Sequence, residues 1–273
     1  MKFTLISDIH TDSNQWDWNI LDGCDPTVPM VVAGDIANDV WQTCHWITEL
    51  RNRFPTVVFV AGNHDFYNSG FHKTRVVPSR EWAEKWPSPS NVTELYDHYT
   101  RWFKAHDVHF LHRGAVEIDG VQFVGGTGWH DFQSGAPLSY DTQVNAWKNY
   151  ISDSRYINWN TDKPYQSVLE ASVLDADAIA QNVASNTLPK VIVTHHIPHR
   201  NCVLFKPDPI WNALNGSFCN TKLENIKDPS IKAWCFGHTH YQWDKQIGDT
   251  RYLCNPRGYP GENPNWTPIE VEI

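Results

Sequence analysis

The chain has 273 residues, of which 41% are hydrophobic, and this is enough apolar material for a sizeable buried core. Its formal net charge of −9 at pH 7 argues against a general electrostatic grip on nucleic acid, because such binding needs a basic face. A nucleotide is still compatible with this charge, because bound metal ions can supply positive charge locally.

The cysteines and the apolar runs indicate the compartment. The 6 cysteines are scattered along the chain and form no CxxC pair. The N-terminal stretch, MKFTLISDIH, reaches an aspartate and a histidine too soon for a signal peptide. No apolar run approaches the roughly 18 residues that span a bilayer. We therefore expect a cytoplasmic protein with free thiols and no membrane contact. The sequence indicates no oligomeric state.

The N-terminal half alternates short apolar runs with amphipathic segments. Residues 2–7, 29–33 and 56–61 are almost continuously apolar, which is typical of strands buried on both faces of a sheet. A helix is predicted over 40–53, where apolar residues recur every three positions, and a second helix over 96–106.

The C-terminal half adds hairpins to this alternation. Residues 116–125 and 241–253 predict hairpin strands, because each contains a two-residue turn signal of glycine and aspartate. The remaining predicted elements are helices over 142–150 and 167–185 and buried strands over 190–194 and 232–236.

This order of elements predicts an α/β fold. We expect one domain over residues 1–273, built as a four-layer α/β/β/α sandwich in which two mixed sheets are flanked by helices. Two segments without clear periodicity, 66–90 and 129–164, are long enough to be functional loops. We expect them to form a lid or mouth over the carboxyl ends of the strands, where open α/β sheets bind ligands.

Each predicted buried strand runs into polar residues that suit metal binding. Histidine nitrogens, carboxylate oxygens and one amide oxygen favour divalent metals such as Mn, Fe or Zn, and no cysteine is among them. The set is too large for one tetrahedral site, whereas two metals that share a bridging carboxylate would use it. The residues expected to converge are Asp8, His10, Asp35, Asn63, His64, His195, His238 and His240.

Five short motifs carry these residues. They are Asp8-Ile9-His10, Gly34-Asp35, Gly62-Asn63-His64-Asp65, Thr194-His195-His196 and Gly237-His238-Thr239-His240. Their order, spacing and strand-end position resemble the five blocks of the calcineurin-like metallophosphoesterases, in a bacterial-type branch of that superfamily. A DxH motif alone occurs by chance in many proteins, but five motifs in this order form a specific pattern.

The resemblance implies a role for each matched residue. Asp35 would bridge two divalent metal ions, with Mn preferred and Fe, Zn, Ni or Co as alternatives. His64 would bind no metal, but would protonate the leaving oxygen or stabilise the charged phosphate. The first ion would be held by Asp8, His10 and His240, and the second by Asn63, His195 and His238.

Two residues next to the motif histidines are open to more than one interpretation. Asp65 either caps the following turn or accepts a hydrogen bond from His64 and fixes its tautomer, which would make Asp65 part of the catalytic machinery. Adjacent residues on an extended backbone point in opposite directions, so only one of His195 and His196 should face the metals. By match to the family pattern it is His195, which leaves His196 to packing or to support of the ligands.

Segments around Trp129 and Arg257 resemble the same bacterial branch and suggest substrate contacts. Trp129 and His130 end a predicted strand on the metal side, so we expect them to line the mouth. His199 and Arg200 follow the fourth motif and are candidates to meet a substrate phosphate. Arg257 pairs either with a phosphate or with a carboxylate at the edge of the core.

The resemblance implies metal-dependent hydrolysis of a small phosphate ester, with nucleotide-like compounds among the candidates. A hydroxide that bridges the two metals would attack phosphorus, and His64 would act as acid or electrostatic stabiliser. We favour a phosphodiesterase. The alternatives are a phosphomonoesterase (a phosphatase), a nuclease, against which the net charge counts, and, least favoured, a non-catalytic scaffold.

Overall fold

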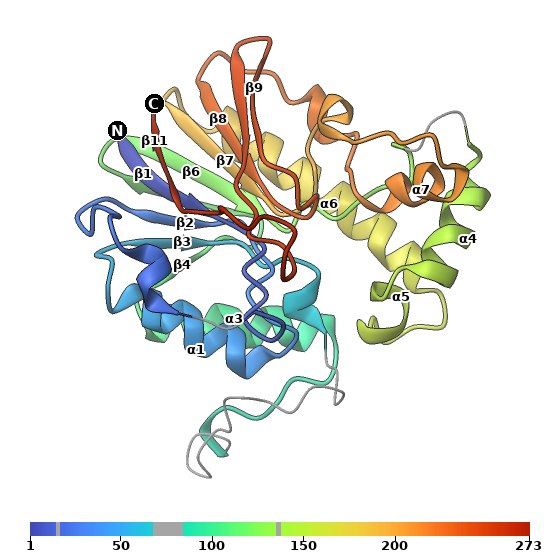
Figure 1. The fold of residues 1–273 in the computed structure, drawn as a ribbon, viewed down its shortest axis with the longest axis horizontal. Helices are drawn as coiled ribbons and strands as arrows, with labels where there is room; N and C mark the ends of the chain where they lie inside the picture. Colours follow the sequence, from blue (N-terminus) through green and yellow to red (C-terminus); the bar gives the residue numbers. More distant parts are fainter. Residues whose placement is uncertain (15–16, 68–83, 135–137) are drawn as a thin grey trace.

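The computed structural model describes residues 1–14, 17–67, 84–134 and 138–273. Within them, two mixed β-sheets pack face to face and helices cover the outer sides (Figure 1). This arrangement confirms the predicted α/β/β/α sandwich. None of the helices in the described part of the chain is both long and apolar enough to cross a bilayer.

The first sheet is 5-stranded, in the order β11-β1-β2-β3-β4. Strands β1 to β4 run parallel, and β11 pairs antiparallel with β1. The bounds are Lys2–Ile6 for β1, Met30–Val32 for β2, Val57–Phe59 for β3, His109–Phe110 for β4 and Ile269–Glu272 for β11. The sequence did not predict β4 and β11, because short edge strands are created by pairing with distant residues rather than by a local pattern.

The second sheet is 6-stranded, in the order β5-β6-β7-β8-β10-β9. Its inner strands run parallel, while β5 and β9 form the antiparallel edges through the two predicted hairpins. The bounds are Gly114–Ile118 for β5, Val121–Gly126 for β6, Lys190–Thr194 for β7, Ile231–Phe236 for β8, Trp243–Ile247 for β9 and Thr250–Cys254 for β10.

Helices cover the outer face of each sheet (Figure 1). Helices α1 (Val40–Arg51) and α3 (Val92–Ala105) lie on the first sheet, and α6 (Pro164–Ala184) packs on β5 and β6. Helix α3 begins earlier than predicted, because the side chain of Asn91 caps it by accepting a hydrogen bond from the backbone N–H of Glu94.

Shorter helices follow or join the main elements. The segment 129–164 contains α4 (Tyr140–Tyr150) and α5 (Asp153–Tyr156), and α7 (Pro209–Leu214) packs beside α4. Short 3₁₀ turns span Trp18–Leu21, His64–Phe66, Arg200–Cys202, Asn215–Ser217 and Leu223–Asn225. Most of the other predicted loop, 66–90, lies outside the described residues.

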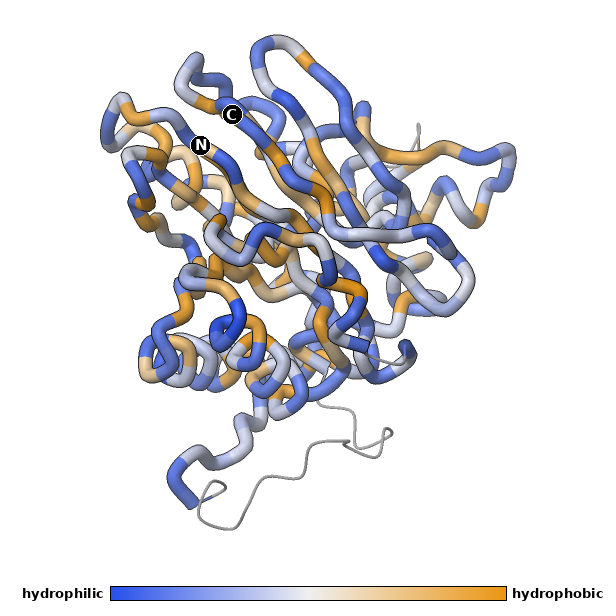
Figure 2. The backbone as a smooth tube through the Cα atoms, turned by 60° about the vertical axis from the view of Figure 1, so that its left-hand side comes forward, coloured by the Kyte–Doolittle hydropathy of each residue, from blue (hydrophilic) through white to orange (hydrophobic). Residues whose placement is uncertain are grey.

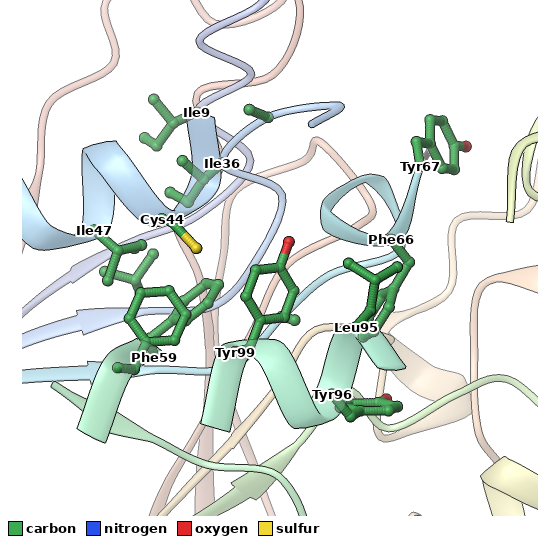
Figure 3. Close-up of a cluster of buried hydrophobic side chains, with 14 of the residues drawn as sticks. Ile9, Ile36, Cys44, Ile47, Phe59, Phe66, Tyr67, Leu95, Tyr96 and Tyr99 are labelled. Carbon is green, nitrogen blue, oxygen red and sulfur yellow. The ribbon is translucent and has the colours of Figure 1, made fainter. Parts of the chain in front are cut away.

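Three buried hydrophobic clusters hold the layers together. Between the sheets, the rings of Phe3 in β1 and Phe123 in β6 meet edge to face, with centroids 5.8 Å apart. Under the first sheet, Ile47 of α1, Tyr99 of α3 and Phe59 of β3 share one cluster (Figure 3). A third cluster joins α6 to the second sheet. Hydrophobic segments therefore run through the interior, and hydrophilic ones dominate the outer loops (Figure 2).

Candidate metal centre

The eight residues expected to converge lie together at one edge of the sandwich. Strands β1, β2 and β3 are neighbours in the first sheet and β7 and β8 in the second, so their carboxyl ends meet where the sheets face each other. Asp8 and His10 follow β1, Asp35 follows β2, Asn63 and His64 follow β3, His195 follows β7, and His238 and His240 follow β8.

Asp8, His10 and His240 form a first group of converging ligand atoms. The Nε2 atoms of His10 and His240 are 3.1 Å apart, and Oδ1 of Asp8 lies 3.5 Å from Nε2 of His240. Glu262 holds the His240 ring, with a carboxylate oxygen 2.6 Å from Nδ1. Burial lowers the pKa of His10 well below its usual value, so its ring is neutral and offers a lone pair. Such a set of nitrogen and oxygen donors fits a divalent cation.

Asn63, His195 and His238 form a second group. Oδ1 of Asn63 lies 3.0 Å from Nε2 of His195 and 3.0 Å from Nδ1 of His238. Nδ1 of His195 donates its hydrogen to the carbonyl oxygen of Ala33 over 2.8 Å, so Nε2 is the ring nitrogen that faces the site. The amide nitrogen of Asn63 donates to Asp153 over 2.8 Å, which fixes the direction of Oδ1.

Asp35 lies between the two groups. Its Oδ2 is 3.2 Å from Nε2 of His195 in the second group and 3.9 Å from Nε2 of His10 in the first. Burial opposes ionisation, but His195 and His64 hold the pKa of Asp35 well below its usual value, so the carboxylate is charged. A charged carboxylate in this position can serve both groups at once. The residues present therefore fit two divalent ions.

The backbone is strained at the residues that carry these ligands. Asp8, His10, Asp35, His238 and His240 have φ angles of 51°, 46°, 57°, 70° and 53°. This left-handed conformation costs about 1–3 kcal/mol at each non-glycine residue and clusters at functional sites. Positive φ turns these side chains into the shared space instead of along the strand.

A glycine allows the loops to approach closely. A Cβ atom on Gly62 would lie 2.2 Å from Oδ1 of Asp35, so no other residue fits there without moving the carboxylate. The third motif therefore begins with glycine because the loop after β3 must pass directly beside Asp35.

His64 lies at the rim of the two groups. Its backbone N–H donates to Oδ1 of Asp35 over 2.9 Å. Its Nδ1 lies 2.5 Å from Oδ1 of Asn38, and its Nε2 lies 3.3 Å from the hydroxyl of Tyr259. The amide nitrogen of Asn38 donates to Asp12 over 2.8 Å, so Oδ1 of Asn38 faces His64 and accepts the Nδ1 hydrogen. Nε2 is thereby directed toward the cavity.

In the described part of the chain Asp65 makes no hydrogen bond to the His64 ring, which corrects the catalytic role that the sequence suggested for it. Asp65 is fully buried, and its carboxylate accepts hydrogen bonds from the backbone N–H groups of Asp35, Ile36 and Gly62 and from the hydroxyl of Thr43. It therefore shapes the loop that carries Asp35, and Asn38, not Asp65, orients the His64 ring. No spacing rule in the sequence pointed to Asn38.

None of the five expected substrate residues is among those that line the cavity over the metal groups. Trp129 and His130 are fully buried, because they pack inward after β6 instead of lining the mouth. His199 borders a separate surface cavity, and Arg200 pairs with Glu224, with its Nε 2.8 Å from Oε1.

Arg257, the fifth expected substrate residue, is partly buried beside the first motif. Its backbone N–H donates to the carbonyl oxygen of Ser7, and burial lowers the pKa of its guanidinium. Arg257 is not among the residues that line the cavity over the metal groups.

A cavity of about 450 Å³ opens over the metal-ligand groups. Residues 150–153, at the junction of α4 and α5, form part of its wall. Six aromatic residues also line it, namely Tyr67, Tyr150, Trp211, Phe218, Tyr241 and Tyr259. The sequence did not reveal this aromatic wall, because its members are scattered over distant parts of the chain.

A comparison with models of protein families identifies the family of this chain. The family model described as calcineurin-like phosphoesterase matches residues 1–242, which include all five motifs. The chain belongs to this family. This calcineurin-like phosphoesterase is therefore a hydrolase that acts on phosphate esters, and the family implies divalent metal ions, for which the groups described above supply ligands.

Two relatives illustrate the range of the similarity. An uncharacterized protein of Acanthamoeba polyphaga mimivirus, L509, is 22% identical over 256 residues, which cover 88% of this chain and 81% of the relative. The crystal structure of phosphopantetheinyl hydrolase (PptH) from Mycobacterium tuberculosis superposes with a TM-score of 0.78 at 18% identity, over 99% of this chain and 95% of that chain. At this identity the second comparison supports the fold alone.

Replacing the bridging carboxylate should empty the site. We expect Asp35→Asn to lose bound metal and phosphoesterase activity together, because it weakens the one side chain that contacts both groups. Loss of residues that merely support a ligand costs about 10–100-fold in metal affinity, so loss of a shared ligand should cost more. Metal content by mass spectrometry, measured beside turnover, checks this. Asp177→Asn, an exposed change on α6, is the matched control; full metal content in Asp35→Asn would contradict the bridging role.

Replacing His64 should separate chemistry from metal binding. We expect His64→Ala to keep its metal and to lose about 10²–10⁴-fold in kcat, with the largest loss for poor leaving groups, as for a general acid. Asn38→Ala should lose less, and should add almost nothing in the His64→Ala background, because it acts through the His64 ring. Steady-state kinetics of the two single variants and the double variant test this. Loss of metal in His64→Ala would instead make His64 a ligand.

Proposed function

We propose that this hydrolase is a phosphodiesterase. The observation that carries the proposal is the charge of the cavity: among its described lining residues there is no lysine or arginine, whereas Asp153 and Glu262 lie on its wall. A phosphate monoester group carries about 1.5 to 2 negative charges at pH 7, and proteins commonly meet such groups with arginine. A diester carries one charge and needs less compensation beyond the metal ions.

The aromatic wall supports the same choice. A diester has a substituent on each side of phosphorus, so one side must leave while the other rests against the protein. Trp211 and Phe218 lie with ring centroids 6.2 Å apart on the wall formed by α7 and the turn after it. Flat aromatic surfaces bind aromatic or heterocyclic groups, and this makes a nucleotide-like diester a suitable substrate class.

Each group of residues has a separate role in the proposed hydrolysis. Divalent ions bound by the two groups would lower the pKa of a water molecule and offset the charge of the phosphate. Asp35 and the histidines hold those ions, and the neighbouring loops fix Asp35. Protonated His64, with Nδ1–H donating to Asn38, can donate its Nε2–H to the departing oxygen. The hydroxyl of Tyr259 lies 3.3 Å from Nε2 of His64.

We also propose manganese as the metal and the cytoplasm as the compartment. Histidine, carboxylate and amide donors without thiolate suit manganese, although iron, zinc, nickel and cobalt share part of this preference. All 6 cysteines are free, 5 of them buried, which suits a reducing compartment. A nuclease is less well supported, because a nucleic-acid strand would need basic residues beside the metals. Three basic residues of the predicted loop 66–90, Lys73, Arg75 and Arg80, lie outside the described residues.

The substrate preference can be measured directly. We expect the protein, stripped of metal and reloaded with Mn²⁺, to hydrolyse bis-p-nitrophenyl phosphate with a kcat/KM at least about tenfold above that for p-nitrophenyl phosphate, a difference of about 1.4 kcal/mol in the barrier. Fe²⁺, Zn²⁺, Ni²⁺ and Co²⁺ restored singly give the metal ranking. Faster turnover of the monoester would overturn the proposal. Because one similar solved structure is a phosphopantetheinyl hydrolase, a phosphopantetheinyl diester belongs in the panel.

The aromatic wall can be tested with the leaving group held constant. We expect Trp211→Ala to lower kcat/KM for bis-p-nitrophenyl phosphate about tenfold, because aromatic contacts of this kind contribute roughly 0.5–1.5 kcal/mol. Methyl p-nitrophenyl phosphate has the same leaving group but no second ring, so its turnover should change little. Leu174→Ala, an exposed change on α6, is the control variant. An equal loss for both diesters would show that Trp211 does not select the second substituent.

A further inference from the structure

A second cluster of ligand-type side chains lies behind the dinuclear site. His130 follows β6, His196 follows β7 and Asp153 begins α5. All three are buried, with exposed fractions of 0%, 0% and 1%. One ligand atom from each lies within 4.8 Å of the other two. The function described above uses none of these three side chains as a ligand or catalytic group.

The cluster contains polar atoms that nothing in the described chain satisfies. Both ring nitrogens of His130, Nε2 of His196 and Oδ2 of Asp153 have no hydrogen-bond partner among the described residues. Buried polar atoms are almost always hydrogen-bonded, and each exception needs an explanation, such as an ion or a water molecule. Four such atoms on three adjoining side chains point to one common occupant.

The chemistry of the cluster indicates a cation. Two imidazole rings and one carboxylate come together in a buried space. Oδ1 of Asp153 accepts hydrogen bonds from Asn63 and from the hydroxyl of Tyr67, whereas Oδ2 has no hydrogen-bond partner among the described residues. A divalent ion would use the lone pairs of two neutral imidazoles and the free carboxylate oxygen together.

We propose that His130, Asp153 and His196 bind a zinc ion, separate from the two ions of the catalytic centre. Two histidines and one carboxylate are a common ligand set for zinc, with a water molecule in the fourth position. Zinc ligands lie about 2.0–2.2 Å from the metal, so binding would draw the three side chains slightly closer than they are in the structure.

The position of the site assigns it a supporting role. Asp153 is hydrogen-bonded to the amide of Asn63, and the ring of His196 packs against that of His238, with centroids 4.4 Å apart. Both contacts lead to ligands of the second catalytic ion. The zinc ion would also join the α4–α5 junction, which borders the cavity, to the ends of β6 and β7. It would thereby fix the amide direction of Asn63 and the cavity wall at once.

Metal stoichiometry tests the proposal without relying on activity. The full-length protein, stripped of metal and titrated with Zn²⁺, should bind about three ions per chain, one more than the dinuclear site holds. His130→Phe, which keeps the ring volume but removes both nitrogens, should bind about two. His98→Phe is the matched control. His98 is also a buried histidine among aromatic rings, but it belongs to α3 and packs against Trp41 of α1, so this variant should keep all the zinc. Asp35→Asn should lose catalytic-site zinc and retain the zinc at His130.

Anomalous scattering from crystals of the zinc-loaded wild-type protein locates the ion even if His130→Phe does not fold. A zinc peak between His130, Asp153 and His196 supports the site. A water molecule there, with zinc peaks only at the catalytic ligands, overturns it. Two bound zinc ions in the wild-type titration, or unchanged stoichiometry in a folded His130→Phe, would do the same. His130→Cys should restore the extra zinc, because a thiolate is a zinc ligand whereas phenylalanine is not.

Discussion

The carboxylate of Asp65 is the constraint on which the metal centre depends. It is buried, and it accepts hydrogen bonds from the backbone N–H groups of Asp35 and Ile36, after β2, and of Gly62, after β3. Thr43 extends the same contact to α1. A buried carboxylate that lost these donors would be strongly destabilising, so the two loops cannot move apart without a large cost. Asp35 is thereby held in a conformation it would not adopt on its own.

The strained backbone at the ligand residues and the glycine at Gly62 follow from the same close approach of the loops. Ligand residues such as Asp8 and His238 keep positive φ because surrounding hydrogen bonds over-determine their backbone. The N–H of His238, for example, donates to Oδ1 of Asp8 over 2.8 Å and joins loops from the two sheets. The energy stored in this backbone is balanced by the packing between the sheets. The result is a convergent set of ligand atoms.

The charge distribution connects the metal centre to the choice of substrate. The ligands, Asp153 and Glu262 place negative charge and neutral donors around the cavity, and the described lining contributes no basic side chain. Bound cations would therefore provide much of the attraction for phosphate, and a singly charged diester, as proposed, would demand the least from them. The α4–α5 junction takes part in two sites. It borders the cavity, and it also contributes the carboxylate of the proposed zinc site.

The sequence by itself determined the buried inner strands, the sandwich of two sheets and the strand-end position of the ligands. Buried strands such as β1 and β7 have continuous apolar runs, and their polar ends must meet when parallel strands share an edge, so His195 and Asp8 could be placed from local patterns. Only the tertiary structure decided the contacts of residues whose neighbours come from distant segments. Asn38 became the partner of His64, Asp65 became a buried loop anchor, and Trp129 and His130 turned inward. Side-chain direction after a strand ends depends on backbone angles and packing, and neither follows any period that the sequence displays.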